Sequence, residues 1–314
     1  MVLINIAFYF ISFFLIWYAS GIIVNSLTRF TKKLKLSTFA VSFFVLGILT
    51  SIPEFAVGIN SIIQQRPGIF IGNLLGASLT LFILVIPILA VLGNGVKMIH
   101  QLSTDNLIFT LLFVAAPTFL IADNVLTRTE SVFLILMYII LFYFIEKKHG
   151  LFVNVREGLE NFKDKNAFED VVELLLACVI VFVTSQYIVT QTIYFSELLS
   201  VSTFLISIVV LSIGTNLPEL SLAIRAVMAG KREVALGDYL GSAAANSLLF
   251  GIFTFLNGDR INIETYSYKT MAMMLLGLGI FYFFSRSKQD ISRREGKILL
   301  LVYLLFLVVE IFLQ

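Results

Sequence analysis

Two proline–glutamate pairs stand inside apolar stretches of this 314-residue chain, at Pro53-Glu54 and at Pro218-Glu219. A proline removes one backbone N–H donor and distorts the preceding helical turn, so carbonyl groups lose their helical partners. A charged side chain near the centre of a bilayer costs about 2.5–3.5 kcal/mol. A cation could bind both the carboxylates and the freed carbonyls, so we predict that both pairs are cation ligands.

Two glutamates in one site would repel each other, and either protonation or a shared cation would remove that repulsion. Ca²⁺ prefers about 6–8 oxygen ligands, of which two bidentate glutamates and one carbonyl from each distorted helix would supply about six. A single pair could instead be a structural kink whose glutamate reaches the membrane surface. That alternative suits two pairs less well, because a threonine precedes each glutamate by four residues, at Thr50 and Thr215.

A second element, G-x-x-x-G, follows each pair as GNLLG and as GDYLG. Glycines four residues apart allow helices to pack closely, which is the structural explanation of this pattern. Packing does not explain the polar residues Asn73 and Asp238. Ser242 and Asn246 are four residues apart and therefore share a helix face, from which they could add neutral oxygens to the site.

The elements that carry these residues are apolar. The chain is 59% hydrophobic and 13% charged, with a mean hydropathy of +0.97, whereas a soluble domain has about 25% charged residues. A bilayer-spanning helix needs about 20 apolar residues. We therefore predict an all-α polytopic membrane protein with ten transmembrane helices. The predicted segments are 2–26, 36–64, 69–95, 106–122, 129–146, 169–192, 199–229, 234–256, 267–284 and 296–313.

The chain contains an internal repeat. Residues 36–79 and 201–244, aligned without a gap, share fourteen identities in forty-four positions, among them the proline–glutamate pair and both glycines. The second helix matches the seventh, and an odd shift reverses the direction through the membrane, which predicts two inverted-topology repeats of five helices. The expected units are a first repeat at 1–146, a cytoplasmic connector at 147–168 and a second repeat at 169–314.

Basic residues gather in the odd-numbered connections between the predicted helices, including 29–35, 147–165 and 286–297. Positively charged loops stay in the cytoplasm. We therefore expect a multi-pass protein of the cell (plasma) membrane with both termini on the extracytoplasmic side.

These residues resemble the cation/calcium exchanger superfamily, and most closely its ten-helix prokaryotic sodium/calcium exchanger-like branch. That family carries G-T-S-x-P-E followed by G-N-x-x-G-S in each of two inverted repeats, and this chain reads GILTSIPE with GNLLGAS and GTNLPE with GDYLGSAAAN. The resemblance implies that Glu54 and Glu219 are the central ion ligands. It also implies backbone carbonyl ligands at Thr50 and Thr215, and sodium sites served by Ser51, Asn216 and Ser242.

The chain departs from the family pattern at five positions in or near these motifs. Leu49 replaces the glycine of the first motif, Ala77 and Leu81 replace polar residues, Asn246 replaces an aspartate, and Asp238 brings a carboxylate where asparagine is usual. Two central glutamates balance one Ca²⁺ or two monovalent ions. The sequence therefore does not decide the number of Na⁺ ions that accompany each Ca²⁺.

The leading hypothesis is a secondary active antiporter that exchanges Ca²⁺, or a related divalent cation, for Na⁺ by alternating access. Proton-coupled exchange is one alternative, and a non-transporting relative that acts as a scaffold or sensor is another. We expect no enzyme activity and no cofactor apart from the transported ions. The expected partners are membrane lipid and inorganic cations but not nucleic acid, and we expect a monomer.

Overall fold

The computed structural model describes residues 2–32, 41–93, 95–97, 104–149, 167–228, 232–258, 260–263, 268–286 and 290–312. Most of the predicted connector, residues 150–166, lies outside the described residues.

The described part of the chain is helical apart from four short strands. The first half contains α1 (Val2–Lys32), η1 (Val41–Leu46), α3 (Gly47–Thr50), α4 (Ile52–Ile63), α5 (Pro67–Thr80), η2 (Leu81–Val85), α6 (Ile86–Leu92), β1 (Val96–Lys97), α7 (Thr104–Leu120), η3 (Ile121–Asp123), β2 (Val125–Thr127) and α8 (Arg128–His149). The second half contains α10 (Ala167–Leu199), α11 (Thr203–Ile206), η4 (Ser207–Leu211), α12 (Ser212–Thr215), α13 (Leu217–Met228), α14 (Arg232–Asn257), β3 (Arg260–Asn262), α15 (Tyr268–Arg286), β4 (Asp290–Ile291) and α16 (Arg293–Phe312).

Within the described residues, seven helices are long and apolar enough to cross a membrane, and a bent pair of helices at 43–50 and 52–63 makes eight. Each of the ten predicted apolar segments coincides with a helix or a run of helices. α7 is apolar but shorter than a full span. α16 has 20 residues and carries three charged residues besides its first two arginines. The protein is therefore an all-α membrane protein with seven to eight apolar spans.

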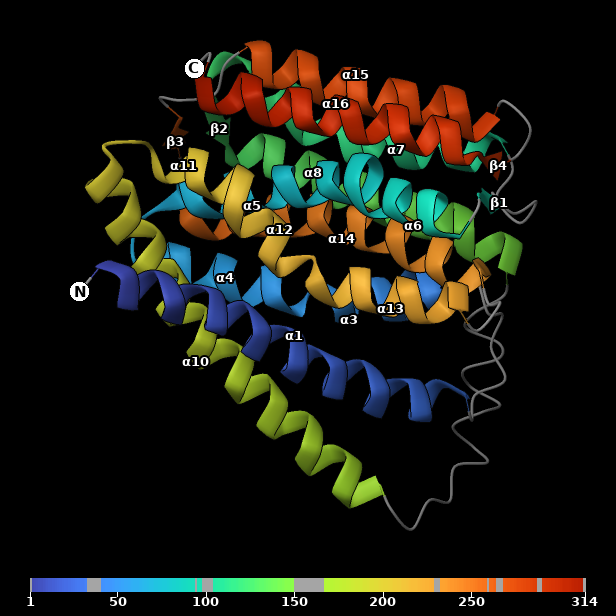
Figure 1. The fold of residues 1–314 in the computed structure, drawn as a ribbon, viewed down its shortest axis with the longest axis horizontal. Helices are drawn as coiled ribbons and strands as arrows, with labels where there is room; N and C mark the ends of the chain where they lie inside the picture. Colours follow the sequence, from blue (N-terminus) through green and yellow to red (C-terminus); the bar gives the residue numbers. More distant parts are fainter. Residues whose placement is uncertain are drawn as a thin grey trace.

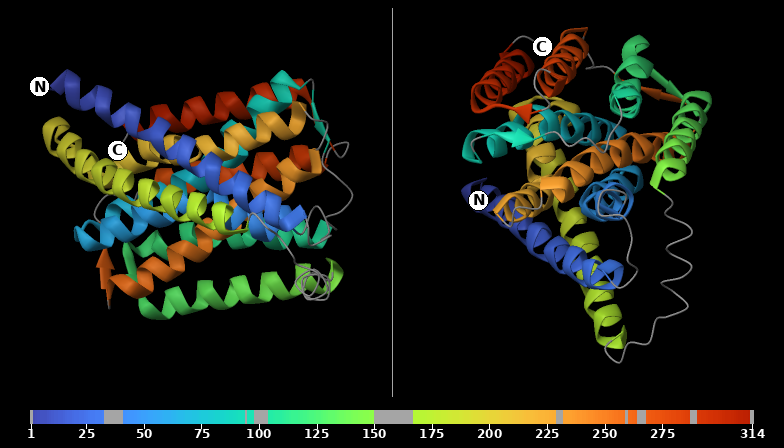
Figure 2. Two further views of the ribbon diagram at one scale, coloured as in Figure 1. Left: turned by 90° about the horizontal axis from the view of Figure 1, so that it is seen from below. Right: turned by 90° about the vertical axis from the view of Figure 1, so that its right-hand side faces the viewer.

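α1 and α10 lie side by side along one edge of the molecule, and α15 and α16 form the opposite edge (Figures 1 and 2). Between these edges lie α3, α4, α5, α12, α13 and α14, which carry the predicted site residues. Hydroxyl and amide groups join α10 to its neighbours. Tyr9 Oη and Thr192 Oγ1 are 2.8 Å apart, and Asn60 Nδ2 donates to Ser185 Oγ at 2.8 Å.

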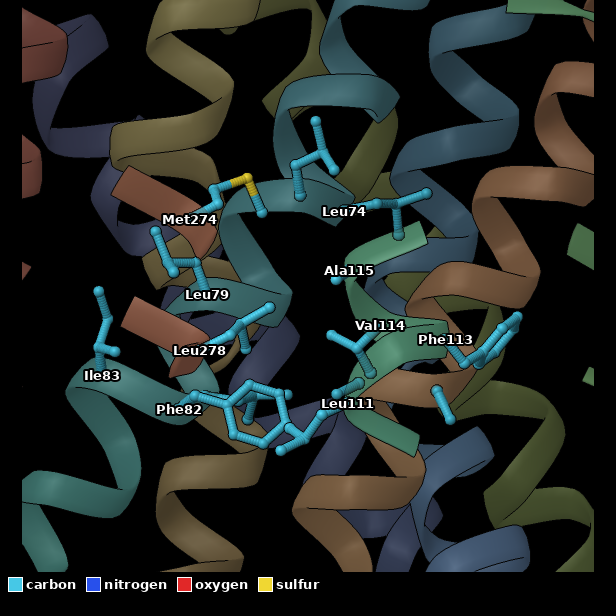
Figure 3. Packing of buried hydrophobic residues seen from close by; sticks show 14 of the residues in the cluster. Leu74, Leu79, Phe82, Ile83, Leu111, Phe113, Val114, Ala115, Met274 and Leu278 are labelled. Atoms are coloured by element: carbon cyan, nitrogen blue, oxygen red, sulfur yellow. The ribbon is translucent and has the colours of Figure 1, made fainter. Parts of the chain in front are cut away.

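The largest buried apolar cluster lies beside the central helices. Figure 3 shows residues of α5, η2, α7 and α15 that point toward one another in this cluster, among them Leu74, Phe82, Val114 and Leu278. Phe82 stacks edge-on against Phe281 with ring centroids 4.8 Å apart. Because lipid is as apolar as these side chains, close packing rather than exclusion of water holds such helices together.

Four short strands join the two halves of the chain. β1 pairs with β4, with Val96 opposite Ile291, and β2 pairs with β3, with Leu126 opposite Ile261. The two sheets are equivalent under the repeat: Val96 corresponds to Ile261, and Leu126 corresponds to Ile291, at the offset of 165 residues. Each half therefore contributes one strand to each two-stranded sheet.

The helices that follow β2 and β4 begin with matching caps. Glu130 Oε2 accepts the backbone N–H of Thr127 at 2.7 Å, and Glu295 Oε2 accepts that of Ser292 at 2.8 Å. In each cap the glutamate N–H lies 3.3–3.4 Å from the hydroxyl oxygen three residues earlier, which is the reciprocal arrangement of a capping box. These residues also differ by 165 in number, so the structural repeat extends beyond the segment that the sequence comparison aligned.

Candidate functional site

Two helices break at equivalent residues. α3 ends at Thr50 and α12 ends at Thr215, and one residue, Ser51 or Asn216, separates each from the next helix. Ser51 has φ −80° and ψ 8°, and Asn216 has φ −84° and ψ 6°. Proline is the second residue of α4 and of α13, where its missing N–H costs no helical hydrogen bond. The predicted distortion therefore takes the form of a break between two short helices, with a bend of 47° in the first copy.

The carbonyls four residues before the prolines keep a partner. The N–H of Ser51 donates to the carbonyl of Leu49, and the N–H of Asn216 donates to that of Gly214. The free oxygen ligands expected from the breaks are therefore not these two carbonyls.

Glu54 and Glu219 are the charged groups at the two breaks. Each is 1% exposed, and each lies in the first turn of a helix, whose N-terminal end favours a negative charge. Glu219 lies close enough to Glu54 and to Asp238 for their charges to interact. Glu54 lies beside the Thr215 side chain, and Glu219 lies beside that of Thr50. Each glutamate thus faces the threonine of the other repeat.

Carboxyl oxygens at this site lack hydrogen-bond donors within the described part of the chain. Both oxygens of Glu54, Oε2 of Glu219 and Oδ2 of Asp238 are buried without a partner. An unpaired buried carboxylate is costly because the low-dielectric interior replaces none of the hydration that it has lost. Such oxygens need either a proton or a cation.

Five residues around Thr50 form what we call the Asp238 cluster: Gly47, Thr50, Ser51, Asp238 and Ser242. The Thr50 hydroxyl lies 3.2 Å from Asp238 Oδ1 and 2.7 Å from Ser242 Oγ. The Gly47 carbonyl accepts from Ser51 Oγ at 2.8 Å and from Ser242 Oγ at 3.3 Å. This cluster joins α3 to α14 through oxygen atoms alone.

The equivalent residues of the other repeat form the Asn73 cluster: Ser212, Thr215, Asn216, Asn73 and Ala77. The Thr215 hydroxyl donates to Asn73 Oδ1 at 3.2 Å, and Asn216 Nδ2 donates to the Ser212 carbonyl at 2.6 Å. Ala77 has no polar side-chain atom. Each of these residues differs by 165 in number from its counterpart in the Asp238 cluster.

Close backbone contacts bring these elements together. A Cβ added to Gly76 would lie 2.5 Å from the carbonyl oxygen of Ile208, and one added to Gly241 would lie 1.9 Å from that of Phe43. Both distances are far below van der Waals contact, so only glycine fits at these two positions. The G-x-x-x-G elements therefore allow close helix packing, as their structural explanation predicts. The polar residues Asn73 and Asp238 lie in the same elements and are not explained by packing.

The ten residues predicted for the site are all at most 2% exposed: Thr50, Ser51, Glu54, Asn73, Thr215, Asn216, Glu219, Asp238, Ser242 and Asn246. The contacts above link nine of them into one region between the two repeats. Asn246 is buried on α14 one turn after Ser242, and its Oδ1 has no hydrogen-bond partner in the described residues.

Three further groups in this region were not predicted from the sequence. The carbonyls of Gly47 and Ser212 each lie one turn before the break, and the alignment at an offset of 165 could have paired them. Tyr239 is 1% exposed and close to Asp238 and Glu219, and its hydroxyl has no partner among the described residues. Its counterpart in the first repeat is Leu74, so the repeat gave no signal for it.

The oxygen atoms at this site suit a hard cation that binds neutral oxygens as well as carboxylates. Among the described residues no group of three or more His, Cys, Asp or Glu side chains has the geometry to hold one metal ion. Hydroxyl, carbonyl and carboxylate oxygens are ligands of Na⁺-like and Ca²⁺-like ions rather than of soft transition metals.

An apolar cavity of about 340 Å³ lies between α1 and α13, next to the second break. The polar side-chain groups of its lining residues are the hydroxyl of Ser221 and the indole N–H of Trp17. The lining residues are Phe14, Trp17, Leu217, Leu220, Ser221 and Ile224. The cavity therefore supplies space beside the helix of Glu219 but no ligand set for an ion.

Broken helices with buried oxygens between them are typical of membrane cation transporters, and comparisons with known proteins identify the class. The family model described as "Sodium/calcium exchanger protein" matches residues 4–146 and again residues 170–312. The chain belongs to this family, contains two of its repeats, and is a cation antiporter of that class rather than an enzyme.

Relatives of similar length include the sodium/calcium exchanger MaX1 of Methanosarcina acetivorans, which is 27% identical, with 92% of this chain and 93% of that protein covered. The putative antiporter CaxA of Alkalimonas amylolytica is 26% identical, with the same coverage of both chains. Among solved structures, the sodium-calcium exchanger NCX_Mj soaked with 2.5 mM Na⁺ and 0.1 mM Ca²⁺ has a TM-score of 0.70 at 22% identity, and 99% of each chain is covered. This last likeness establishes the fold.

Proposed function

We propose that this protein exchanges Ca²⁺, or a related divalent cation, for Na⁺ across the membrane by alternating access. The observation that carries the proposal is the pair Glu54 and Glu219: two buried carboxyl groups, one from each repeat, that lie within range of each other's charge. The relatives MaX1 and NCX_Mj are described as sodium/calcium exchangers, which supports the same choice of ions.

In this proposal the two glutamates bind the divalent ion at the centre of the site. Carbonyl oxygens of Thr50 and Thr215 complete its coordination, because both residues end a helix beside a glutamate of the other repeat. Neutral oxygens around this centre bind Na⁺. The further candidates are Ser51, Asn73, Asn216, Asp238, Ser242 and Asn246.

Exchange follows from the cost of an empty site. Two or three buried carboxylates without a cation are too costly to carry through a conformational change, since the effective penalty is several kcal/mol per buried ion. The protein therefore changes its orientation only with one or other cation bound. Any net charge moved per cycle makes transport sensitive to voltage by about 2.3 kcal/mol per charge per 100 mV.

We infer that the ten helical segments form two inverted repeats. Two observations support this architecture. Each two-stranded sheet contains one strand from each half, and each threonine at a break contacts a residue of the other half. A pseudo-two-fold axis would relate the two sheets, and likewise the two threonine contacts. The repeats correspond to residues 1–146 and 169–314, joined by a connector at 147–168. The distribution of basic residues supports extracytoplasmic termini in the cell membrane.

The test is ⁴⁵Ca²⁺ uptake into proteoliposomes loaded with Na⁺, at one pH on both sides and with the membrane potential clamped. Wild-type protein should take up Ca²⁺ only when an outward Na⁺ gradient is present. Glu54→Gln and Glu219→Gln should each reduce uptake to that of empty liposomes. Glu197→Gln, which changes a glutamate paired with Arg66 at the surface, should keep the wild-type rate. Full uptake by both site variants would falsify the proposed site.

Proton-coupled exchange is a second candidate, because the unpartnered carboxyl oxygens of Glu54 could hold protons instead of Na⁺. A pH gradient without Na⁺ separates the two functions in the same liposomes. Uptake driven by the pH gradient alone would favour proton coupling. Ca²⁺ binding without uptake under either gradient would indicate a non-transporting relative.

A further inference from the structure

The apolar cavity next to the second break has no part in the proposed ion site. It has a volume of about 340 Å³, and four of its lining residues come at helical spacing from one face of α13. They are Leu217, Leu220, Ser221 and Ile224. Phe14 and Trp17 of α1 complete the lining, with their ring centroids 6.3 Å apart. Ligand cavities in proteins have volumes of about 300–1,000 Å³ and mainly apolar linings, so this cavity has the size and the lining of a binding site.

The equivalent place in the other repeat is filled by aromatic side chains. Phe55 of α4 corresponds to Leu220 at the offset of 165 residues, and Phe182 of α10 corresponds to Trp17 in the same way. The rings of Phe55 and Phe182 lie edge to face with centroids 6.1 Å apart, so they occupy the space between their two helices. Phe55 also contacts the ring of Phe253, at 5.8 Å between centroids. Leucine in place of phenylalanine leaves the corresponding space beside α13 unfilled.

A hydrogen bond also holds the two helices of the other repeat together. Asn60 Nδ2 on α4 donates to Ser185 Oγ on α10 at 2.8 Å. Ser20 on α1 is the counterpart of Ser185, and its buried hydroxyl has no hydrogen-bond partner in the described part of the chain. α1 instead contacts α12 just before the break, where a Cβ added to Gly214 would overlap the ring of Phe13. The gap between α1 and α13 therefore opens beyond this contact.

The cavity is continuous with the lipid-facing surface of α1. Phe14 lines the cavity and is 62% exposed, and its neighbours Leu15 and Tyr18 are 46% and 67% exposed. Phe14 and Trp17 lie inside the apolar span Val2–Ile23, which places the cavity at the depth of lipid tails rather than of headgroups. Apolar cavities stay free of water. A bilayer supplies hydrocarbon at this depth, so the surroundings favour a hydrocarbon occupant.

We propose that this cavity binds one acyl chain of a bilayer lipid between α1 and α13. The chain contacts the aliphatic side chains of Leu217, Leu220 and Ile224 on one side and the two rings of α1 on the other. It takes the place that the ring of Phe55 takes in the other repeat. The acyl chain site is independent of the ions that the protein exchanges, since none of its lining residues is among the proposed ion ligands.

Trp17 is the only tryptophan of the chain and lines the cavity, so its fluorescence reports what the cavity contains. The purified protein is reconstituted into phosphatidylcholine vesicles whose acyl chains are either plain or brominated, because bromine quenches an indole ring that it touches. Trp17 of the wild-type protein should lose fluorescence as the fraction of brominated lipid rises. Leu220→Phe, which supplies the ring found at Phe55, and Ser221→Leu should each lose a large part of this quenching, because their side chains fill the cavity.

Leu15→Phe is the matched control. It adds the same ring to the exposed surface of α1 without lining the cavity, and it should keep the quenching of the wild-type protein. Acrylamide, a neutral quencher dissolved in the water phase, is the second probe and should quench Trp17 weakly. The melting temperature of each variant in detergent shows that it is folded, and if Leu220→Phe does not fold, Ser221→Leu carries the test.

Three results would overturn the acyl chain site. Unchanged quenching by brominated lipid in both cavity variants would mean that Trp17 meets lipid only at the outer surface of α1. Strong quenching by acrylamide with weak quenching by brominated lipid would mean that water fills the cavity. Wild-type fluorescence that responds to neither quencher would mean that side chains close the cavity.

Discussion

The hydroxyl of Thr50 lies 3.2 Å from Oδ1 of Asp238, a residue 188 positions later in the chain. The equivalent residues of the other repeat, Thr215 and Asn73, make the same contact at the same distance. The acceptor in the first contact is a carboxylate and in the second a neutral amide. Two repeats with the same geometry thus create two different electrostatic environments, and a variant at one position has a matched control at the equivalent position of the other repeat.

Replacing Thr50 with valine should weaken cation binding more than replacing Thr215. Valine keeps the branched shape but leaves Asp238 Oδ1 and Ser242 Oγ without the hydroxyl. A buried acceptor that loses its donor costs about 1–3 kcal/mol, and more if it is charged. Thr215→Val deprives only the amide oxygen of Asn73 among the side-chain contacts found here. The apparent affinities for Ca²⁺ and Na⁺ from thermal titration provide the measurement, and equal losses in both variants would contradict the asymmetry.

Alanine at Gly76 or at Gly241 should destabilise the protein. The added methyl group would lie 2.5 Å from the carbonyl of Ile208 in the first case and 1.9 Å from that of Phe43 in the second. Overpacking of this kind costs about 1–3 kcal/mol because the helices must move apart. The melting temperature in detergent should fall in both variants.

Gly21→Ala and Gly279→Ala are the controls for this effect. Both glycines lie within helices, and an added Cβ would meet nothing within 4 Å. Their melting temperatures should stay the same or rise, because alanine favours the helix over glycine. A fall as large as that of Gly241→Ala would show that close packing is not the cause.

The two capping boxes should contribute equally to stability. Thr127→Ala and Ser292→Ala each remove the hydroxyl that caps a glutamate N–H, in α8 and in α16 respectively. Loss of an N-cap side chain costs about 0.5–2 kcal/mol. We expect equal falls in melting temperature and unchanged Ca²⁺ affinity in both variants, since neither residue belongs to the site. Loss of Ca²⁺ affinity in only one of them would mean that its helix end influences the site.

The amide of Asn60 should hold α4 against α10. Its Nδ2 donates to Ser185 Oγ at 2.8 Å and to the Ala56 carbonyl of its own helix at 2.9 Å. Hydrogen bonds between transmembrane helices contribute on average about 0.6 kcal/mol and at most about 1.7. Asn60→Leu should therefore lower the melting temperature by a small, measurable amount. Ser12→Ala should not, because the one hydrogen bond of the Ser12 hydroxyl among the described residues goes to the Phe8 carbonyl of its own helix. Similar falls in both variants would argue against a link between helices.

The sequence by itself determined the membrane character, the helical segments, the repeat and the places where two helices break. These follow from local properties: apolar length sets a membrane span, and proline at Pro53 and Pro218 cannot continue a helix from the preceding turn. The family resemblance drawn from the same motifs is confirmed by the match of the family model to both halves. The form of the breaks differed in detail, because the carbonyls of Leu49 and Gly214 accept the backbone N–H groups of Ser51 and Asn216 at the breaks.

Only the tertiary structure decided which residues of one repeat meet which residues of the other. The sequence could align Asp238 with Asn73, but contacts between residues more than a hundred positions apart depend on how whole helices pack. Packing set the Thr50 hydroxyl against the carboxylate of Asp238 and the Thr215 hydroxyl against the amide oxygen of Asn73. The asymmetry of the site is therefore a property of the fold, because the carboxylate of Asp238 and the amide of Asn73 reach equivalent threonines only when the two repeats pack together.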